Sequence, residues 1–278
     1  MHYNKNENSV CILGIGGTGP ILLSLIFAIQ TMKPMLSKQL RNTILTGILF
    51  LPAIVTAQTL SLRQQIASIC ESKHAIIGVY VQVIESGDTL SFNGIKHFPM
   101  QSVFKFPLAL YILSQVDKGK LSLNQRLFIS KKELLPDTWS PLRDSHRGGN
   151  FYMTLRDLLQ YTISHSDNNG CDILFRLAGG PDKVNHYIHG LGMKNISIKT
   201  TETQMHSAWN VQFSNWATPV AVTKLLVLFY NGKILSPASR DFLLKMMEGT
   251  TTGANKIKGL LPSGTLVAHK SGLSDRNK

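Results

Sequence analysis

The sequence predicts an α+β fold in which an antiparallel sheet is flanked by helices and an all-helical lobe is inserted between its strands. Three observations predict it: segments rich in β-branched residues come first, segments with helical periodicity fill the middle, and one strand-like segment returns near the end. The chain has 278 residues, of which 43% are hydrophobic and 16% charged, as is typical of a globular protein. We expect this domain to cover residues 58–278.

The first elements of the domain are a helix and a hairpin. Residues 59–71 place Leu62, Ile66 and Ile69 at helical spacing, which predicts an N-terminal helix. Residues 75–94 are rich in β-branched side chains around a Ser-Gly-Asp sequence, which predicts a β-hairpin.

Helices fill the middle of the domain. Residues 104–119 form a strongly apolar helical pattern that ends at Gly119. Later helical patterns cover residues 154–165, 168–177, 181–191, 219–230 and 237–247. Residues 265–272 then have the pattern of a strand, which we expect to join the strands from the start of the domain.

The segment before the domain has the layout of a secretory signal peptide. In residues 35–57, Lys38 and Arg41 precede an apolar core, and small residues up to Ala57 precede a cleavage site. The apolar core is shorter than the ~20 residues that a membrane span requires. We therefore expect the protein to be periplasmic or secreted.

Residues 1–34 lie upstream of this signal, although a signal peptide belongs at the N-terminus. They are either an extension from a start codon assigned too early, with Met35 as the true initiator, or a membrane anchor. Residues 14–19 fit the dinucleotide pattern G-x-G-x-x-G. Pro20 follows at once, and no acidic residue for a ribose hydroxyl occurs between Glu7 and Glu71, so we reject a nucleotide site.

Composition argues against nucleic-acid and metal sites. The formal net charge is +13, but the basic residues are scattered and do not interleave with aromatic residues, unlike those of a nucleic-acid surface. His186 and His189 are spaced as helix neighbours without an H-E-x-x-H frame, so no metal or other cofactor is expected. Cys70 and Cys171 are too few for a disulfide framework, and whether they pair is left open.

Three short motifs carry the chemistry. They are S-x-x-K at residues 102–105, S-D-N at 166–168 and K-S-G at 270–272. Each motif alone is weak, because short patterns of common residues recur by chance. Together, in this order and in an exported chain, they indicate an enzyme that forms an acyl-serine intermediate.

The first motif supplies a nucleophile and a neighbouring base. Positions i and i+3 share a helix face, so Lys105 lies one turn from Ser102 and points towards it. Pro107 suits the opening of a helix, which places Ser102 at the N-terminal end, where backbone N–H groups and the helix dipole favour negative charge. The alternative is an unremarkable surface pair, but the surrounding apolar residues bury this helix, and a buried lysine requires partners.

The other two motifs supply a proton relay and a binding site. Ser166 is expected to relay a proton to the leaving nitrogen and Asn168 to hold a substrate amide. The alternative is a helix N-cap, which Ser166 and Asp167 favour, and both roles can hold together. Lys270 is expected to attract a substrate carboxylate and Ser271 to offer a hydroxyl; the alternative is a basic tail.

The chain resembles class A serine β-lactamases, and within them the extended-spectrum branch of the VEB and PER types and, more distantly, CfxA. The likeness covers about residues 58–278 and implies a β-lactamase/transpeptidase-like fold. Besides the motifs, the segments that carry it are FPMQSVFKFPLAL, LLPDTWSPL, YTISHSDNNGCDIL, TETQMHSAWN, NWATP and VAHKSG.

The resemblance also implies further site residues and a substrate. Glu202 corresponds to the general base for deacylation, and His206 occupies a position that is asparagine in most class A enzymes. Trp139 corresponds to a residue at the pocket mouth. The backbone N–H groups of Ser102 and Leu273 correspond to the oxyanion hole, and Gly272 belongs with Lys270 and Ser271 to the substrate-binding residues. The implied partner is a small β-lactam, bound by a monomer with no cofactor and no lasting membrane partner.

The sequence departs from the family pattern in two places. Many class A enzymes anchor the loop of the general base with an arginine–aspartate pair, where this chain has threonines before Glu202 and Asn215 later. Leu273 is bulkier than the residue usual there, and its side chain is expected to crowd the pocket.

The likeness also ends early. The family continues after the K-S-G strand with two strands and a helix, which are absent here, so we expect that strand to expose an edge. Two alternatives to a hydrolase follow. One is a penicillin-binding peptidase, against which Glu202 argues. The other is a protein that is not an enzyme, either an inactive truncated remnant or a β-lactam-binding sensor module, which the early end favours.

Overall fold

The structure is a computed structural model that describes residues 10–14, 62–73 and 75–274. The expected signal peptide at residues 35–57 lies outside the described residues. Within the described part of the chain, no helix is long and apolar enough to cross a membrane.

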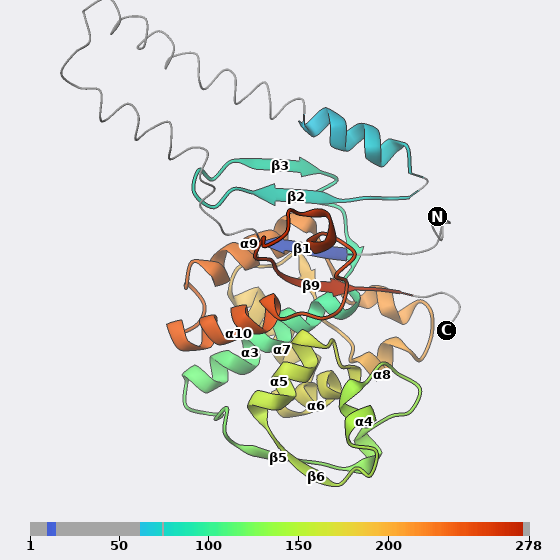
Figure 1. Ribbon diagram of the computed structural model, residues 1–278, viewed down its shortest axis with the longest axis vertical. Helices are drawn as coiled ribbons and strands as arrows, with labels where there is room; N and C mark the ends of the chain where they lie inside the picture. Colours follow the sequence, from blue (N-terminus) through green and yellow to red (C-terminus); the bar gives the residue numbers. More distant parts are fainter. Residues whose placement is uncertain (1–9, 15–61, 74, 275–278) are drawn as a thin grey trace, which may run out of the picture.

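The helical lobe is built around α3 (Lys105–Asp117), which runs through the middle of the molecule (Figure 1). Most of its apolar side chains, among them Phe106, Leu110 and Leu113, are fully buried, and burying each large one stabilises the fold by ~1.5–3 kcal/mol. The helices that pack against it are α5 (Leu155–Ser164), α6 (Asn168–Ala178), α7 (Pro181–Gly190) and α10 (Pro237–Glu248). These helices, and α9 (Pro219–Tyr230), agree closely with the segments expected from the sequence.

The strands form four small antiparallel sheets among the described residues. The expected hairpin is β2 (Val79–Gln82) with β3 (Thr89–Phe92), preceded by a helix over residues 62–71. The short strands β4 (Phe98–Pro99), β8 (Trp216–Ala217) and β7 (Ile196–Ser197) pair in that order. The α+β class is therefore confirmed, but the strands are divided among several sheets rather than joined in one.

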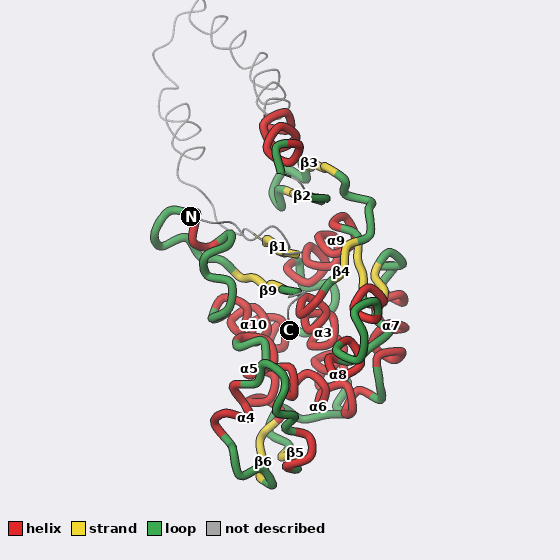
Figure 2. The backbone as a smooth tube through the Cα atoms, turned by 90° about the vertical axis from the view of Figure 1, so that its right-hand side faces the viewer, coloured by secondary structure: helices red, strands yellow, loops and turns green. Residues whose placement is uncertain are grey.

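The strand that carries the K-S-G motif has a ladder partner. This strand is β9 (Ala268–Gly272), and it pairs antiparallel with β1 (Val10–Gly14), so that Ile12 lies opposite Lys270. The two strands lie side by side in both ribbon views (Figures 1 and 2). In the uncleaved chain this edge of β9 is therefore paired rather than exposed, whereas the cleavage expected after Ala57 would remove β1 and leave the edge open.

Several short elements were not predicted. The strands β5 (Arg126–Ile129) and β6 (Phe151–Thr154) pair at the far end of the helical lobe (Figure 1). Residues 130–150 separate them, so the local turn signal that marks a hairpin is missing. Short helices lie on the loops near the motifs: η1 (Gln101–Phe104), η2 (Lys131–Glu133), α4 (Pro141–Ser145), α8 (Glu202–Met205), η3 (Val211–Ser214) and η4 (Lys258–Leu260).

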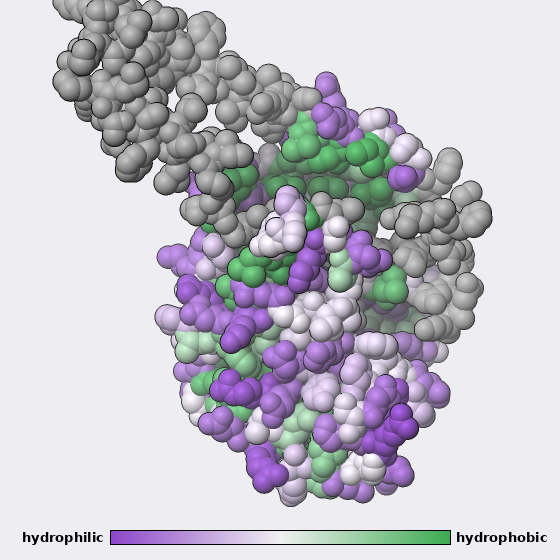
Figure 3. Space-filling model, in the orientation of Figure 1, coloured by the Kyte–Doolittle hydropathy of each residue, from purple (hydrophilic) through white to green (hydrophobic). Residues whose placement is uncertain are grey.

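Apolar side chains gather over β2 and β3 on the face shown in Figure 3. Ile76 and Ile95, at the ends of this hairpin region, are 75% and 81% exposed.

The two cysteines of the domain do not pair with each other. Cys70, on the helix over residues 62–71, and Cys171, on α6, are both buried and free, so the pairing left open by the sequence does not occur.

Candidate active site

The nucleophile region is a tight turn that leads directly into α3. Ser102 lies in the 3-10 helix η1, and α3 begins with Lys105 directly after it. The Lys105 Nζ atom donates a hydrogen bond to Ser102 Oγ at 3.0 Å. The expected spacing of the two residues on one helical face is therefore what the structure shows, with a 3-10 turn in place of the first α-helical turn.

Lys105 is fully buried and surrounded by oxygen atoms. Besides Ser102 Oγ, its Nζ atom lies 2.8 Å from the carbonyl oxygen of Ser166 and 2.5 Å from Asn168 Oδ1. It also lies 2.8 Å from Glu202 Oε1, in an ion pair of which both members are almost completely buried. A buried ammonium without such partners would be strongly destabilising, so this cluster is what allows a charged lysine here.

The S-D-N loop is fixed by its aspartate. Asp167 caps α6 by accepting a hydrogen bond from Gly170 N at 2.7 Å, and it also accepts from Ser140 Oγ and Leu142 N. Burial raises the pKa of Asp167, although these hydrogen bonds and the charge of Lys105 oppose the rise. Ser166, just before the cap, has a left-handed backbone with φ +58°. The loop therefore serves both expected purposes: Asp167 caps α6, while the Ser166 carbonyl and the Asn168 side chain contact Lys105.

Asn168 connects this loop to the segment that carries Trp139. Its Nδ2 atom donates to Thr138 Oγ1 at 2.7 Å, and its backbone N–H donates to the Trp139 carbonyl at 3.0 Å. The Trp139 side chain is 59% exposed and its Nε1 atom donates to the His165 carbonyl at 2.9 Å. Trp139 therefore lies at the surface next to the S-D-N loop.

Lys270 approaches Ser166 from β9. It is fully buried, and its Nζ atom donates to Ser166 Oγ at 2.8 Å and to the Ser271 carbonyl at 2.9 Å. Burial and the neighbouring charge of Lys105 hold the pKa of Lys270 well below its usual value, although Glu202 opposes this. Ser166 thus lies between two lysines, with its carbonyl on Lys105 and its hydroxyl on Lys270.

The end of β9 passes very close to the nucleophile. A Cβ atom built on Gly272 would lie 2.6 Å from the Met100 carbonyl oxygen and 3.1 Å from the backbone nitrogen of Ser102, so only glycine fits there. Ser271 is buried, whereas the Leu273 side chain is 54% exposed. Because a side chain at the mouth of an open site is also exposed, the expectation that Leu273 crowds the pocket stays a prediction.

Glu202 is presented by a loop that two polar side chains hold in place. Asn215 is fully buried; it accepts hydrogen bonds from Lys199 N at 2.7 Å and Thr200 N at 3.0 Å, and donates to the Thr200 carbonyl at 2.9 Å. These hydrogen bonds join the two ends of the loop that carries Glu202. They lie where many class A enzymes have an arginine–aspartate ion pair, which this sequence lacks.

The second of these side chains is Asp172, which sequence reasoning missed. Its carboxylate accepts hydrogen bonds from Glu202 N at 2.7 Å, Thr203 N at 2.9 Å and Thr203 Oγ1 at 2.6 Å. A usable signal was present, because Asp172 lies four residues after Asn168 and so on the same face of α6. Burial, followed by repulsion from Glu202, raises the pKa of Asp172, while the loop hydrogen bonds oppose this.

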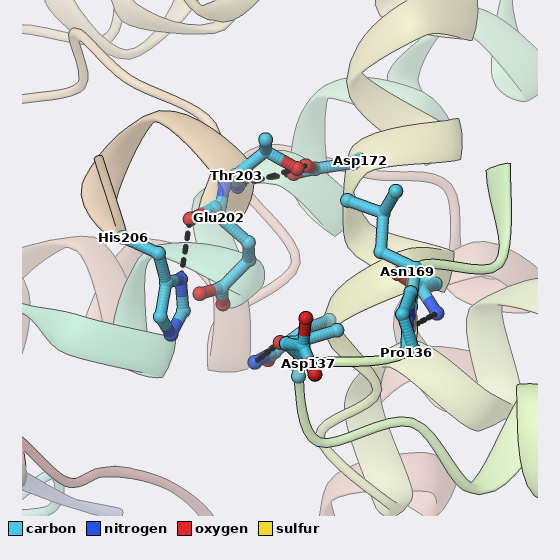
Figure 4. Close-up of a pocket in the computed structure, with 10 residues that line it drawn as sticks. Pro136, Asp137, Asn169, Asp172, Glu202, Thr203 and His206 are labelled. Carbon is cyan, nitrogen blue, oxygen red and sulfur yellow. Dashed lines mark hydrogen bonds between the residues drawn. The ribbon is translucent and has the colours of Figure 1, made fainter. Parts of the chain in front are cut away.

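Beside Glu202 lies a pocket of about 220 Å³. Glu202 and His206 come to it from the α8 loop, and Asp137 lies on its opposite wall (Figure 4). The His206 Nδ1 atom is 2.7 Å from the Glu202 carbonyl oxygen, which holds the imidazole beside the carboxylate. The other residues that line the pocket are Leu135, Pro136, Thr138, Asn168, Asn169, Asp172 and Thr203.

Comparison with known proteins assigns the chain to a family. A family model described as the beta-lactamase enzyme family matches residues 61–278. The chain belongs to this family. It is 47% identical over 236 residues to the β-lactamase VEB-1 of Pseudomonas aeruginosa, a match that covers 84% of this chain and 79% of that protein. It is 43% identical over 219 residues to the extended-spectrum β-lactamase PER-1 of the same organism, covering 79% and 71%.

Solved structures agree with this assignment. A β-lactamase from Chitinophaga pinensis DSM 2588 is 53% identical, with a TM-score of 0.75 over 77% of this chain and 78% of that chain. The TLA-1 extended-spectrum β-lactamase is 52% identical, with a TM-score of 0.76 over 78% and 79%. The resemblance read from the motifs is therefore confirmed: the chain is a hydrolase of the class A β-lactamase family.

No metal centre is found in this β-lactamase chain as far as the structure describes it. Residues 10–14, 62–73 and 75–274 contain no group of three or more His, Cys, Asp or Glu side chains placed to hold an ion. His189, considered from the sequence, instead has its Nε2 atom 2.8 Å from the Ile196 carbonyl, where it joins α7 to the start of β7.

Proposed function

We propose that this chain hydrolyses β-lactam antibiotics, penicillins or cephalosporins, through an acyl-enzyme on Ser102. The observation that carries the proposal is the buried cluster in which Lys105 Nζ lies 3.0 Å from Ser102 Oγ and 2.8 Å from Glu202 Oε1. In this arrangement a hydroxyl, a cation and a carboxylate meet at one point, as an activated serine nucleophile requires.

Acylation begins when Ser102 Oγ attacks the lactam carbonyl and loses its proton. Two acceptors are close, Lys105 Nζ at 3.0 Å and Glu202 Oε1 at 3.4 Å. Either group can take the proton, Lys105 directly or Glu202 through a water molecule, so acylation does not depend on the Glu202 carboxylate alone. Backbone N–H groups of Ser102 and Leu273 stabilise the oxyanion, a contribution that typically amounts to ~10²–10³ in rate per donor.

Opening of the ring requires a proton on the leaving nitrogen. Ser166 Oγ supplies this proton. Lys270 Nζ, which donates a hydrogen bond to Ser166 Oγ at 2.8 Å, then replaces the proton or stabilises the oxygen that has lost it. Lys270 also attracts the carboxylate that penicillins and cephalosporins carry next to this nitrogen, with Ser271 as a second donor. Asn168 holds the side-chain amide of the antibiotic.

Deacylation requires a water molecule and a base. Glu202, with the His206 ring held beside it, activates this water for attack on the acyl-enzyme. No cofactor takes part. The signal-peptide pattern at residues 35–57 supports export to the periplasm, where a monomer would meet its substrate.

Hydrolysis of the chromogenic cephalosporin nitrocefin by the purified 278-residue chain tests the proposal. Turnover is expected, and Ser102→Ala should reduce it by about 10³-fold or more, because the nucleophile is lost. Glu202→Gln should form an acyl-enzyme that persists, whereas the exposed Glu85→Gln, far from the site, should behave as the parent chain. A parent chain that forms a lasting adduct without turnover would instead be a penicillin-binding protein, and one that forms no adduct would be an inactive remnant.

A further inference from the structure

Gln212 joins three parts of the chain that surround the nucleophile. It lies in η3, on the same loop as Glu202, and its side chain is 7% exposed. Its Oε1 atom accepts hydrogen bonds from Gln101 Nε2 at 2.6 Å and from Ser274 Oγ at 2.6 Å, while its own Nε2 donates to the Trp209 carbonyl at 2.8 Å. Both acceptor sites of the Gln212 oxygen are therefore occupied by buried donors from other segments.

Gln101 is the residue immediately before Ser102, and its backbone is unusual. Its φ of +46° lies in the left-handed region, which residues other than glycine adopt only when their surroundings enforce it. The peptide that follows carries the N–H of Ser102. Because the buried Gln101 amide is anchored on Gln212, the direction of this N–H depends on that anchor.

Ser274 is the residue immediately after Leu273. Its buried hydroxyl ends on the same Gln212 oxygen, just beyond the point where Gly272 passes the backbone nitrogen of Ser102. The two N–H groups assigned to the oxyanion hole, on Ser102 and Leu273, are thus each one residue from a side chain that Gln212 holds.

We propose that Gln212 is a positioning residue for the oxyanion hole. By accepting hydrogen bonds from Gln101 and Ser274 with one atom, it sets the backbone of the nucleophile turn and the end of β9 at a fixed distance from each other. It acts through these neighbours, and the inference rests on the acyl-enzyme function proposed above. Gln212 also ties both N–H groups to the loop of Glu202, so the oxyanion hole and the catalytic carboxylate share one support.

The test measures acylation alone. In a Glu202→Gln background the adduct accumulates, so its rate of formation with benzylpenicillin can be followed by intact-protein mass. Gln212→Met keeps the length of the side chain but loses the acceptor, and we expect acylation to slow by about 10–100-fold, since loss of a whole oxyanion donor costs about 10²–10³-fold. Gln212→Glu keeps the oxygen that accepts from Gln101 and Ser274 but turns a second oxygen towards the Trp209 carbonyl, so it should restore only part of the rate. Gln160→Met, on the exposed face of α5, is the matched control.

A second background separates positioning from general support of the loop. With Gln101→Ala and Ser274→Ala already present, Gln212→Met should slow acylation no further, because the groups through which it acts are gone. If Gln212→Met does not fold, Ser274→Ala alone replaces it and should slow acylation by a smaller factor. Equal acylation rates for Gln212→Met and Gln160→Met overturn the inference alone. Absence of any adduct in the Glu202→Gln parent overturns the proposed function and the inference with it.

Discussion

Asp172→Asn tests how the loop of Glu202 is held. The carboxylate of Asp172 accepts three hydrogen bonds from two consecutive residues, Glu202 N, Thr203 N and Thr203 Oγ1. An asparagine has one oxygen in place of two, so it can keep the bond to Glu202 N but turns an NH₂ group towards the two donors of Thr203. The substitution therefore loosens the first turn of α8, on which Glu202 stands.

The magnitude follows from the bonds that are lost. Hydrogen bonds to an ionised acceptor contribute a net ~1.5–3 kcal/mol each, and two are lost. Part of this is offset, because burial and Glu202 raise the pKa of Asp172, which means that its charge is itself unfavourable in the folded protein. Thr203 is exposed, so water also replaces part of each lost bond; at ~1 kcal/mol net for each of the two, about 2 kcal/mol remains, which corresponds to about 30-fold in rate if all of it raises the barrier to deacylation.

The assay separates deacylation from folding. The lifetime of the acyl-enzyme with benzylpenicillin should lengthen by up to about 30-fold in Asp172→Asn, while the rate of acylation changes less. Asp182→Asn, an exposed aspartate in the first turn of α7, provides the matched control and should leave the lifetime unchanged. An unaltered lifetime and an unaltered melting temperature in Asp172→Asn would refute the claim that this carboxylate holds the loop.

Three other outcomes are expected. Asn215→Ala removes four hydrogen-bonding contacts from a fully buried position, and should lower the free energy of unfolding by about 2–4 kcal/mol, measured by urea denaturation; a loss below 1 kcal/mol on that scale would contradict the assigned role. Deletion of residues 1–14 removes β1, the ladder partner of β9, and should lower the melting temperature and increase hydrogen exchange in β9; unchanged exchange in β9 would count against the pairing. Burial, with Lys258 and Lys270 nearby, lowers the pKa of His269, so the unfolded chain binds more protons between that pKa and about 6.5, and stability should fall as pH drops through this window. His269→Leu, which also removes a buried Nε2 without a hydrogen-bond partner in the described structure, should flatten that pH dependence in urea titrations, and an equal slope in both proteins would argue against it.

The sequence predicted the parts of the fold that local signals determine. Proline and glycine at helix ends gave the limits of the central helices closely, as at α9, because caps and breakers act within a few residues. It failed for the β5–β6 pair and for the β1–β9 pair, since strand partners far apart in sequence leave no local signal. The motif spacing predicted that Ser102 and Lys105 lie together, as they do.

The supports of the site were harder to predict. Asp172 and Gln212 belong to no motif, and each acts by accepting hydrogen bonds from backbone or side-chain groups that only the folded loop brings near. Asn215 was noted in the sequence only as a departure from an ion pair, and the structure gives it a function of its own. Such contacts depend on tertiary geometry, so side-chain type and spacing alone do not determine them.

Peptide mapping of the acylated protein tests the central claim most directly. The 278-residue chain is mixed with benzylpenicillin, quenched in acid at successive times, digested and analysed by mass spectrometry. The account predicts a penicilloyl group on the peptide that contains Ser102, which appears and then disappears as free penicilloate accumulates, and which persists in Glu202→Gln. A modification at another residue, or no modification while the antibiotic remains intact, would contradict it.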